Sequence, residues 1–113
     1  MTKTDDNVAI QFIKGKSEKD CPEIRLFRNH DGKKGKVVYK FYNPTTITLK
    51  NYTSVEKMYL IDSEGELSTK KIDLSISEDH IKEVKSIYNW NTEKEFERFM
   101  RFASRYANSH YLN

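Results

Sequence analysis

Apolar and polar residues alternate along most of this chain, and that pattern predicts strands. The clearest strand is 36–42, where Val37, Tyr39 and Phe41 share one face of an extended backbone and the residues between them share the other. Pro44 ends this strand, because proline donates no hydrogen bond to a sheet ladder. Alternation or β-branched runs predict further strands at 8–13, 23–28, 56–62, 67–76 and 81–88.

An Asp-Gly pair within 29–35 supplies the positive φ of a tight turn and predicts a hairpin between 23–28 and 36–42. The segment 81–88 also allows a helix, but the alternation of Val84, Ser86 and Tyr88 favours a strand. The polar segment 14–22 is interpreted as a connection, and 47–55 is ambiguous.

The pattern changes to helical spacing after residue 92. Thr92 and Glu95 form a capping box, in which each side chain accepts a hydrogen bond from a free amide of the first turn. The three-and-four spacing that follows predicts a helix over about 93–107. Its predicted buried face consists of Phe96, Phe99, Met100, Ala103, Tyr106 and Ala107.

Hairpins followed by one amphipathic helix indicate the α+β class: an antiparallel β-sheet sandwich with a C-terminal helix packed on one face. At 113 residues the chain is expected to be a single domain, 1–113, with 1–7 as a disordered tail. Aromatic residues make up 12% of the chain, which argues against disorder of the whole. No apolar run reaches the roughly 18 residues of a membrane span, and the polar start does not resemble a secretory signal or a transit peptide.

Little in the sequence suggests catalysis, and no enzyme activity, metal or cofactor is expected. The three histidines, His30, His80 and His110, are too dispersed to form a metal-binding pair and are expected in solvated loops. Cys21 stands alone, so it forms no internal disulfide. Asp62, Glu64 and Glu66 resemble a calcium loop superficially, and a solvated hairpin turn is favoured instead.

The helix and the sheet each carry a candidate binding surface. Arg98, Arg101, Phe102 and Arg105 lie off the predicted buried face, and arginine with an outward aromatic is typical of an interface; a solvated face with a Glu97–Arg101 pair is equally compatible. On the sheet, Lys36, Lys40 and Tyr42 are candidates, because one helix cannot cover both faces, and an open edge can accept a partner's strand.

A small single-stranded nucleic-acid-binding domain is the alternative function. It would use Lys33, Lys34, Lys36, Lys40 and the tyrosines. Residues 1–53 carry eleven basic against six acidic residues, but there is no dense basic stripe and no RNP-type motif.

Several motifs resemble, in order and spacing, the Psb-twenty-eight (Psb28) family of small extrinsic photosystem II proteins from cyanobacteria and plastids. They are Ala-Ile-Gln-Phe at 9–12 with Gly15, Pro-Glu-Ile-Arg-Leu at 22–26, the acidic hairpin 58–66, and 97–102 with Arg105, Tyr106 and Ala107. The resemblance extends from Val8 to His110. The helix motif and the acidic hairpin are its most specific parts.

The resemblance implies an α+β sandwich without enzyme activity or bound cofactor. It implies a peripheral protein on the cytoplasmic (or stromal) side of the thylakoid membrane, bound transiently to immature photosystem II. The implied partners are the chlorophyll antenna subunit of about forty-seven kilodaltons, the cytochrome b subunit and the reaction-centre subunits, without nucleic acid. The implied role is that of an assembly factor.

Overall fold

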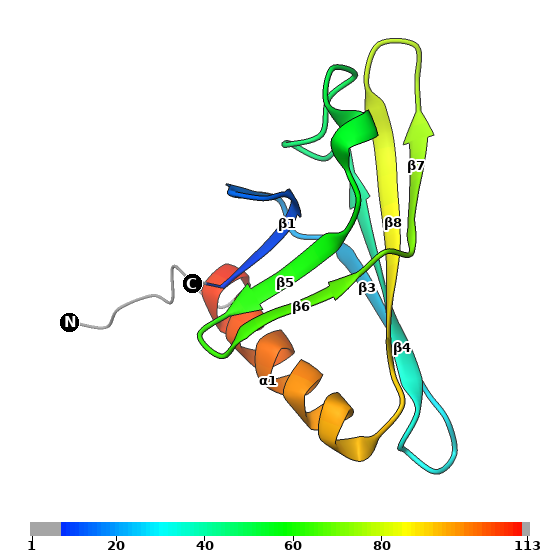
Figure 1. Ribbon diagram of the computed structural model, residues 1–113, viewed down its shortest axis with the longest axis vertical. Helices are drawn as coiled ribbons and strands as arrows, with labels where there is room; N and C mark the ends of the chain where they lie inside the picture. The colour runs from blue at the N-terminus through cyan, green and yellow to red at the C-terminus, as the bar shows by residue number, and fades with distance from the viewer. Residues whose placement is uncertain (1–7, 112–113) are drawn as a thin grey trace, which may run out of the picture.

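Residues 8–111 of the computed structural model form two four-stranded antiparallel sheets and one C-terminal helix (Figure 1). The predicted α+β class, with a helix packed on an antiparallel sheet, is confirmed. The predicted tail, 1–7, lies outside the described residues.

The two sheets interleave segments from both halves of the chain. The first has the order β2-β1-β5-β6, with β1 at Ala9–Ile13, β2 at Lys16–Ser17, β5 at Met58–Asp62 and β6 at Gly65–Thr69. The second has the order β3-β4-β8-β7, with β3 at Glu23–Arg28, β4 at Gly35–Tyr42, β7 at Ile72–Ile76 and β8 at Ile81–Trp90. A short 3-10 helix, η1, covers Tyr52–Ser54, and the helix α1 covers Glu93–His110.

The core lies where the inward faces of the two sheets and the helix meet. Val37, Tyr39 and Phe41 are at most 2% exposed, which confirms the predicted inward face of this strand. Met58 and Leu60 supply the corresponding inward positions of β5. A single cluster of buried apolar side chains therefore includes residues of both sheets and the helix.

The predicted strand 67–76 is wrong, because the chain makes two strands there in different sheets. β6 pairs with β5 as far as Thr69, opposite Met58, where β5 begins. With no partner beyond that point, the chain crosses to the second sheet, and β7 pairs with β8 from Ile72. The Thr69 hydroxyl donates to the carbonyl of Ile87 at 2.6 Å, which ties this crossing to β8. The predicted connection 14–22 likewise contains the short strand β2.

The helix begins where the sequence predicts and ends three residues later than predicted. The hydroxyl of Thr92 accepts from the Glu95 N–H at 3.1 Å, but the Glu95 carboxylate accepts from Asn91 rather than from Thr92. Half of the predicted capping box is therefore confirmed, and the other half is shifted by one residue. α1 follows β8 directly and runs beside β5 and the β5–β6 turn (Figure 1).

Candidate functional site

The three predicted arginines of α1 lie in a row above the turn between β5 and β6. Asp62 at the end of β5 and Glu64 in the turn face this row. We call these five residues the arginine clamp. The sequence prediction of a solvated hairpin turn is confirmed for residues 63–66, which are exposed, but it is wrong for Asp62, which is buried and bound by the helix.

Asp62 is the buried centre of the arginine clamp. Its side chain has no exposed surface, and its two oxygens accept from Arg98 at 2.7 and 2.9 Å. Arg105 adds a contact at 2.9 Å and the Glu64 N–H one at 3.0 Å. Burial by itself raises the pKa of Asp62, but the hydrogen bonds from Arg98, Arg105 and the Glu64 amide bring it below its ordinary value. Asp62 is therefore held as a carboxylate.

Glu64 forms the outer half of the arginine clamp. Arg101 binds it with two parallel contacts of 2.7 and 2.9 Å, and Arg105 approaches it at 2.6 Å. Such two-pronged pairing is the strong form of a charged hydrogen bond. Hydrogen bonds from Arg101 and Arg105 lower the pKa of Glu64 to about 2. Within residues 8–111, no group of three histidine, cysteine or acidic side chains is placed to hold a metal ion.

The prediction that Phe102 points outward is wrong. Phe102 has no exposed surface, and its ring lies 6.5 Å from Phe99 and 5.8 Å from Tyr106. Met100, predicted to be buried, is 38% exposed. The reason is the rotation of the helix about its own axis. Arg98, Arg101 and Arg105 form ion pairs with Asp62 and Glu64 of the β5–β6 turn, and in this orientation Phe102 faces the core.

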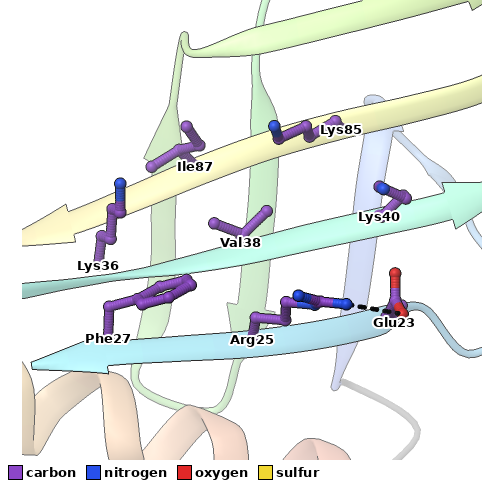
Figure 2. Close-up of a pocket in the computed structure, with 8 residues that line it drawn as sticks. All are labelled: Glu23, Arg25, Phe27, Lys36, Val38, Lys40, Lys85 and Ile87. Atoms are coloured by element: carbon purple, nitrogen blue, oxygen red, sulfur yellow. Dashed lines mark ion pairs between the residues drawn. The ribbon is translucent and has the colours of Figure 1, made fainter.

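Lys36, Lys40 and Tyr42 lie elsewhere, on the outward side of the second sheet. Lys36 and Lys40 meet residues there that the sequence did not point to, and Figure 2 shows their side chains projecting together from β3, β4 and β8. We call this surface the basic face; its members are Glu23, Arg25, Phe27, Lys36, Val38, Lys40, Tyr42, Lys85 and Ile87. All of them except Tyr42 line a shallow hollow of about 340 Å³. Arg25, Phe27 and Lys85 join this face because of the register in which β3 and β8 pair with β4. Alternation within one strand does not predict which residues of the neighbouring strands lie beside it.

Strand β3 is an open edge of the second sheet. It pairs with β4 on one side, and its other side has no strand neighbour among the described residues. Ile24 and Leu26 lie opposite Tyr39 and Val37, yet they are 40% and 45% exposed because they extend past the covered core. An edge strand of six residues offers unpaired N–H and C=O groups to another strand.

Sequence reasoning also missed a buried carboxylate, Glu18, which is 2% exposed. Its oxygens accept from the backbone N–H groups of Thr45 and Thr46 at 2.7 and 3.0 Å and from both threonine hydroxyls. Glu18 thus fixes the loop after β4 against the connection after β2. Its position in a polar segment gave no sign of burial.

The fold and its charged clusters define a small two-sheet α+β protein whose terminal helix is fastened by ion pairs and whose second sheet carries a basic outward face and an open edge at β3. No helix in residues 8–111 has the length and apolar character needed to cross a membrane. The family model described as "Psb28 protein" matches residues 10–113. The chain belongs to the Psb28 family.

Curated relatives agree with this assignment over nearly their whole length. A protein named "Photosystem II reaction center Psb28 protein" from Prochlorococcus marinus (strain NATL2A) is 81% identical over 109 residues, 96% of each chain. Proteins of the same name from Synechococcus sp. (strain CC9605) and Cyanidium caldarium are 36% and 41% identical. The first alignment covers 92% of this chain and 82% of the relative, and the second covers 87% and 89%.

Proposed function

We propose that this chain is a non-catalytic, extrinsic assembly factor of photosystem II. It binds transiently at the cytoplasmic (or stromal) side of the thylakoid membrane, to intermediates that contain the large chlorophyll antenna subunit. The cytochrome b subunit and the reaction-centre subunits complete the contact region. Its role is to assist biogenesis or repair and to leave before the complex is finished.

This proposal rests on the similarity of the chain, over nearly its full length, to relatives named as photosystem II proteins, one of which is 81% identical over 96% of each chain. The arrangement of polar groups is compatible with a role in binding. The acidic pair that could have served chemistry, Asp62 and Glu64, is occupied by arginines. His30, His80 and His110 lie in the β3–β4 turn, the β7–β8 loop and the last turn of α1, so they do not form one site.

We propose that partner contacts are made by the open edge β3 and by two charged surfaces. A partner segment added to β3 would gain main-chain hydrogen bonds, and the exposed Ile24 and Leu26 would give it apolar contacts. On the helix, Arg101 is the most available arginine at 50% exposure, with Arg98 and Arg105 behind it. On the sheet, Lys36, Lys40 and Tyr42 provide the second charged surface.

Co-purification tests the function. A tagged copy is expressed in cyanobacterial cells, membrane complexes are solubilised gently, and native complexes are separated and probed for the antenna subunit. We expect the chain to travel with antenna-containing intermediates and to be missing from the oxygen-evolving complex. Recovery in soluble fractions alone would refute the proposal.

Edge docking is tested by a lysine on the open strand, since charged residues discourage strand addition. We expect Leu26→Lys to reduce recovery of the complex. Ile76→Lys is the matched control, because Ile76 is 49% exposed on β7, the other edge of the same sheet. Equal recovery of both variants would exclude β3 as the docking edge.

The role of Arg101 is tested by exchanging charges within the arginine clamp. Arg101→Glu is expected to weaken association, because a basic interface becomes acidic. The double variant Arg101→Glu/Glu64→Arg restores an ion pair inside the protein but leaves the helix surface acidic. We expect the double variant to stay weak; full recovery would mean that Arg101 acts only through the fold.

A further inference from the structure

The lysines of the basic face make no ion pair among the described residues, although Lys40 also lies opposite Glu23 and Lys85 opposite Asp73 in the strand ladders. Lys40 and Lys85 are direct cross-strand partners on β4 and β8. In the part of the chain that the structure describes, no carboxylate lies within ion-pairing distance of Lys36, Lys40 or Lys85. Like charges directly opposite each other destabilise a sheet. An anionic partner would remove this repulsion.

The surface around these charges is amphipathic. Val38 and Ile87 form a half-buried apolar floor between the lysines (Figure 2). Phe27 is 48% exposed and Tyr42 53% exposed. Lys36 lies 5.5 Å from the Phe27 ring and Lys40 5.8 Å from the Tyr42 ring. Long cationic side chains over apolar surface, with flanking aromatics, are suited to a membrane interface.

Peptides and nucleic acids fit this face less well. On its flat side, the main-chain groups of β4 are used in ladders with β3 and β8, so a peptide would find no backbone partners there. The two exposed aromatics are at opposite ends of the hollow. Phe27 pairs with Lys36, and Tyr42 is six residues further along β4, roughly 20 Å at about 3.3 Å per residue. Neighbouring bases cannot stack on rings so far apart.

We propose that the basic face binds the anionic headgroups of a lipid bilayer. It would hold the second sheet against the membrane while the β3 edge remains free for a protein partner. The inference rests on the proposed function, which places the chain beside a membrane complex, but it assigns a separate contact to lipid.

The carboxylates on the same side of the sheet set the strength of this contact. They are Glu23, Asp73 and Glu83, against the cations Arg25, Lys36, Lys40, Lys71 and Lys85. Glu23 is already engaged by the Tyr42 hydroxyl at 3.2 Å and by Arg25 at 3.8 Å. Five cations and three anions leave a net charge of +2, so the contact is weak and sensitive to salt.

Vesicle flotation with the full chain tests the proposal. One set of vesicles contains phosphatidylcholine alone, and the other contains phosphatidylcholine and phosphatidylglycerol in equal amounts. We expect flotation with the anionic vesicles at about 0.1 M salt, none with the neutral vesicles, and loss of binding at about 1 M salt, where the Debye length is about 3 Å. Failure of the unaltered chain to float with anionic vesicles at low salt would overturn the proposal.

A matched pair of variants separates the face from net charge. Lys40→Glu/Lys85→Glu changes the basic face, whereas Lys50→Glu/Lys94→Glu changes two exposed lysines outside it; each takes the net charge from +3 to −1. Each lysine near an anionic surface contributes about a five-fold factor, so the first variant is expected to bind about thirty-fold more weakly or worse. Equal losses in the two variants would overturn the proposal.

Further measurements keep the result interpretable. Circular dichroism and urea unfolding test whether each variant folds. If Lys40→Glu/Lys85→Glu does not fold, the milder variant Lys40→Gln/Lys85→Gln replaces it in the flotation experiment. Tighter binding of single-stranded RNA or polyglutamate than of anionic vesicles would overturn the lipid assignment. If the unaltered chain co-purifies with the complex but does not bind anionic vesicles, the lipid inference alone is contradicted. If it binds anionic vesicles but does not co-purify, the assembly function alone is contradicted.

Discussion

The arginine clamp predicts a large loss of stability when the Asp62 carboxylate is removed. In Asp62→Asn the shape of the side chain stays, but the Arg98 guanidinium, 17% exposed, loses its two-pronged partner. Removing one partner of a buried pair costs about 3–5 kcal/mol. Arg98 and Arg105 keep contacts to Glu64 at 3.6 and 2.6 Å, so we expect about 3 kcal/mol, the low end.

Urea unfolding measures this loss. A domain of this size has a total free energy of unfolding of about 5–15 kcal/mol, so the effect is a sizeable fraction of it. With an m-value of about 2 kcal/mol/M, the midpoint should fall by about 1.5 M. The m-value should stay unchanged, because the same surface is exposed on unfolding. Glu64→Gln is the comparison, and we expect a smaller loss because that side chain is 30% exposed.

The pH dependence gives an independent check of the same reasoning. The pKa of Asp62 is lowered in the folded protein, so its stabilising effect is present at neutral pH and disappears as the carboxylate is protonated in acid. The gap between the unaltered chain and Asp62→Asn should therefore narrow as the pH falls below about 4. A loss below about 1 kcal/mol at pH 7, or a gap that does not change with pH, would refute the role of Asp62 as the buried anchor of the helix.

Three further outcomes follow from the structure. Phe102→Ala should lower the free energy of unfolding by about 3–5 kcal/mol in urea, whereas Phe27→Ala should change it by less than about 0.5 kcal/mol, since the first ring is buried and the second is half exposed. Gly35→Ala should lower the free energy of unfolding by about 1–3 kcal/mol and alter the fluorescence of Trp90. The reason is that a Cβ at this position would lie 2.4 Å from the Phe27 carbonyl oxygen and 2.6 Å from the Trp90 indole ring. An unchanged urea midpoint would contradict this prediction. The pKa of Glu64 is lowered from 4.5 to about 2, so the stability that its carboxylate provides is present above pH 4.5 and is lost as the pH falls toward 2. Urea unfolding followed by circular dichroism should show a fall in the free energy of unfolding across this pH range. A free energy of unfolding that does not change with pH would refute the prediction.

Local pattern was sufficient for most elements of the fold. The inward face of β4 follows from alternation, because successive side chains of a strand point to opposite sides. The start of α1 follows from Thr92, whose hydroxyl satisfies a free amide of the first turn whatever the helix packs against. Motifs within the chain also indicate its family, which the match to the Psb28 family model and to relatives of that name confirms.

The candidate site was predicted only in part. The residues named on α1 and β4 include the charged groups that the structure places at two surfaces, but not their neighbours. Helical spacing places Arg98 and Arg105 off the buried face, but it does not indicate that they bind a carboxylate 36 and 43 residues away in the chain. The basic face needed Lys85, which only the pairing of β8 with β4 brings opposite Lys40.

The sequence by itself determined most of the strands, the helix and its amphipathic character, since these depend on neighbours a few residues apart. It did not determine the short strand β2 or the break between β6 and β7. The tertiary structure decided which side of the helix is buried. At about 100° per residue, Phe102 lies about 60° from Phe99 on one side, and Phe96 lies about 60° from it on the other. In the structure Phe102 is fully buried, whereas Phe96 is only partly buried against Trp90, and this roll of the helix is the one in which its arginines reach the distant β5–β6 turn. Contacts between remote segments depend on register and roll, which the local order of residues does not specify.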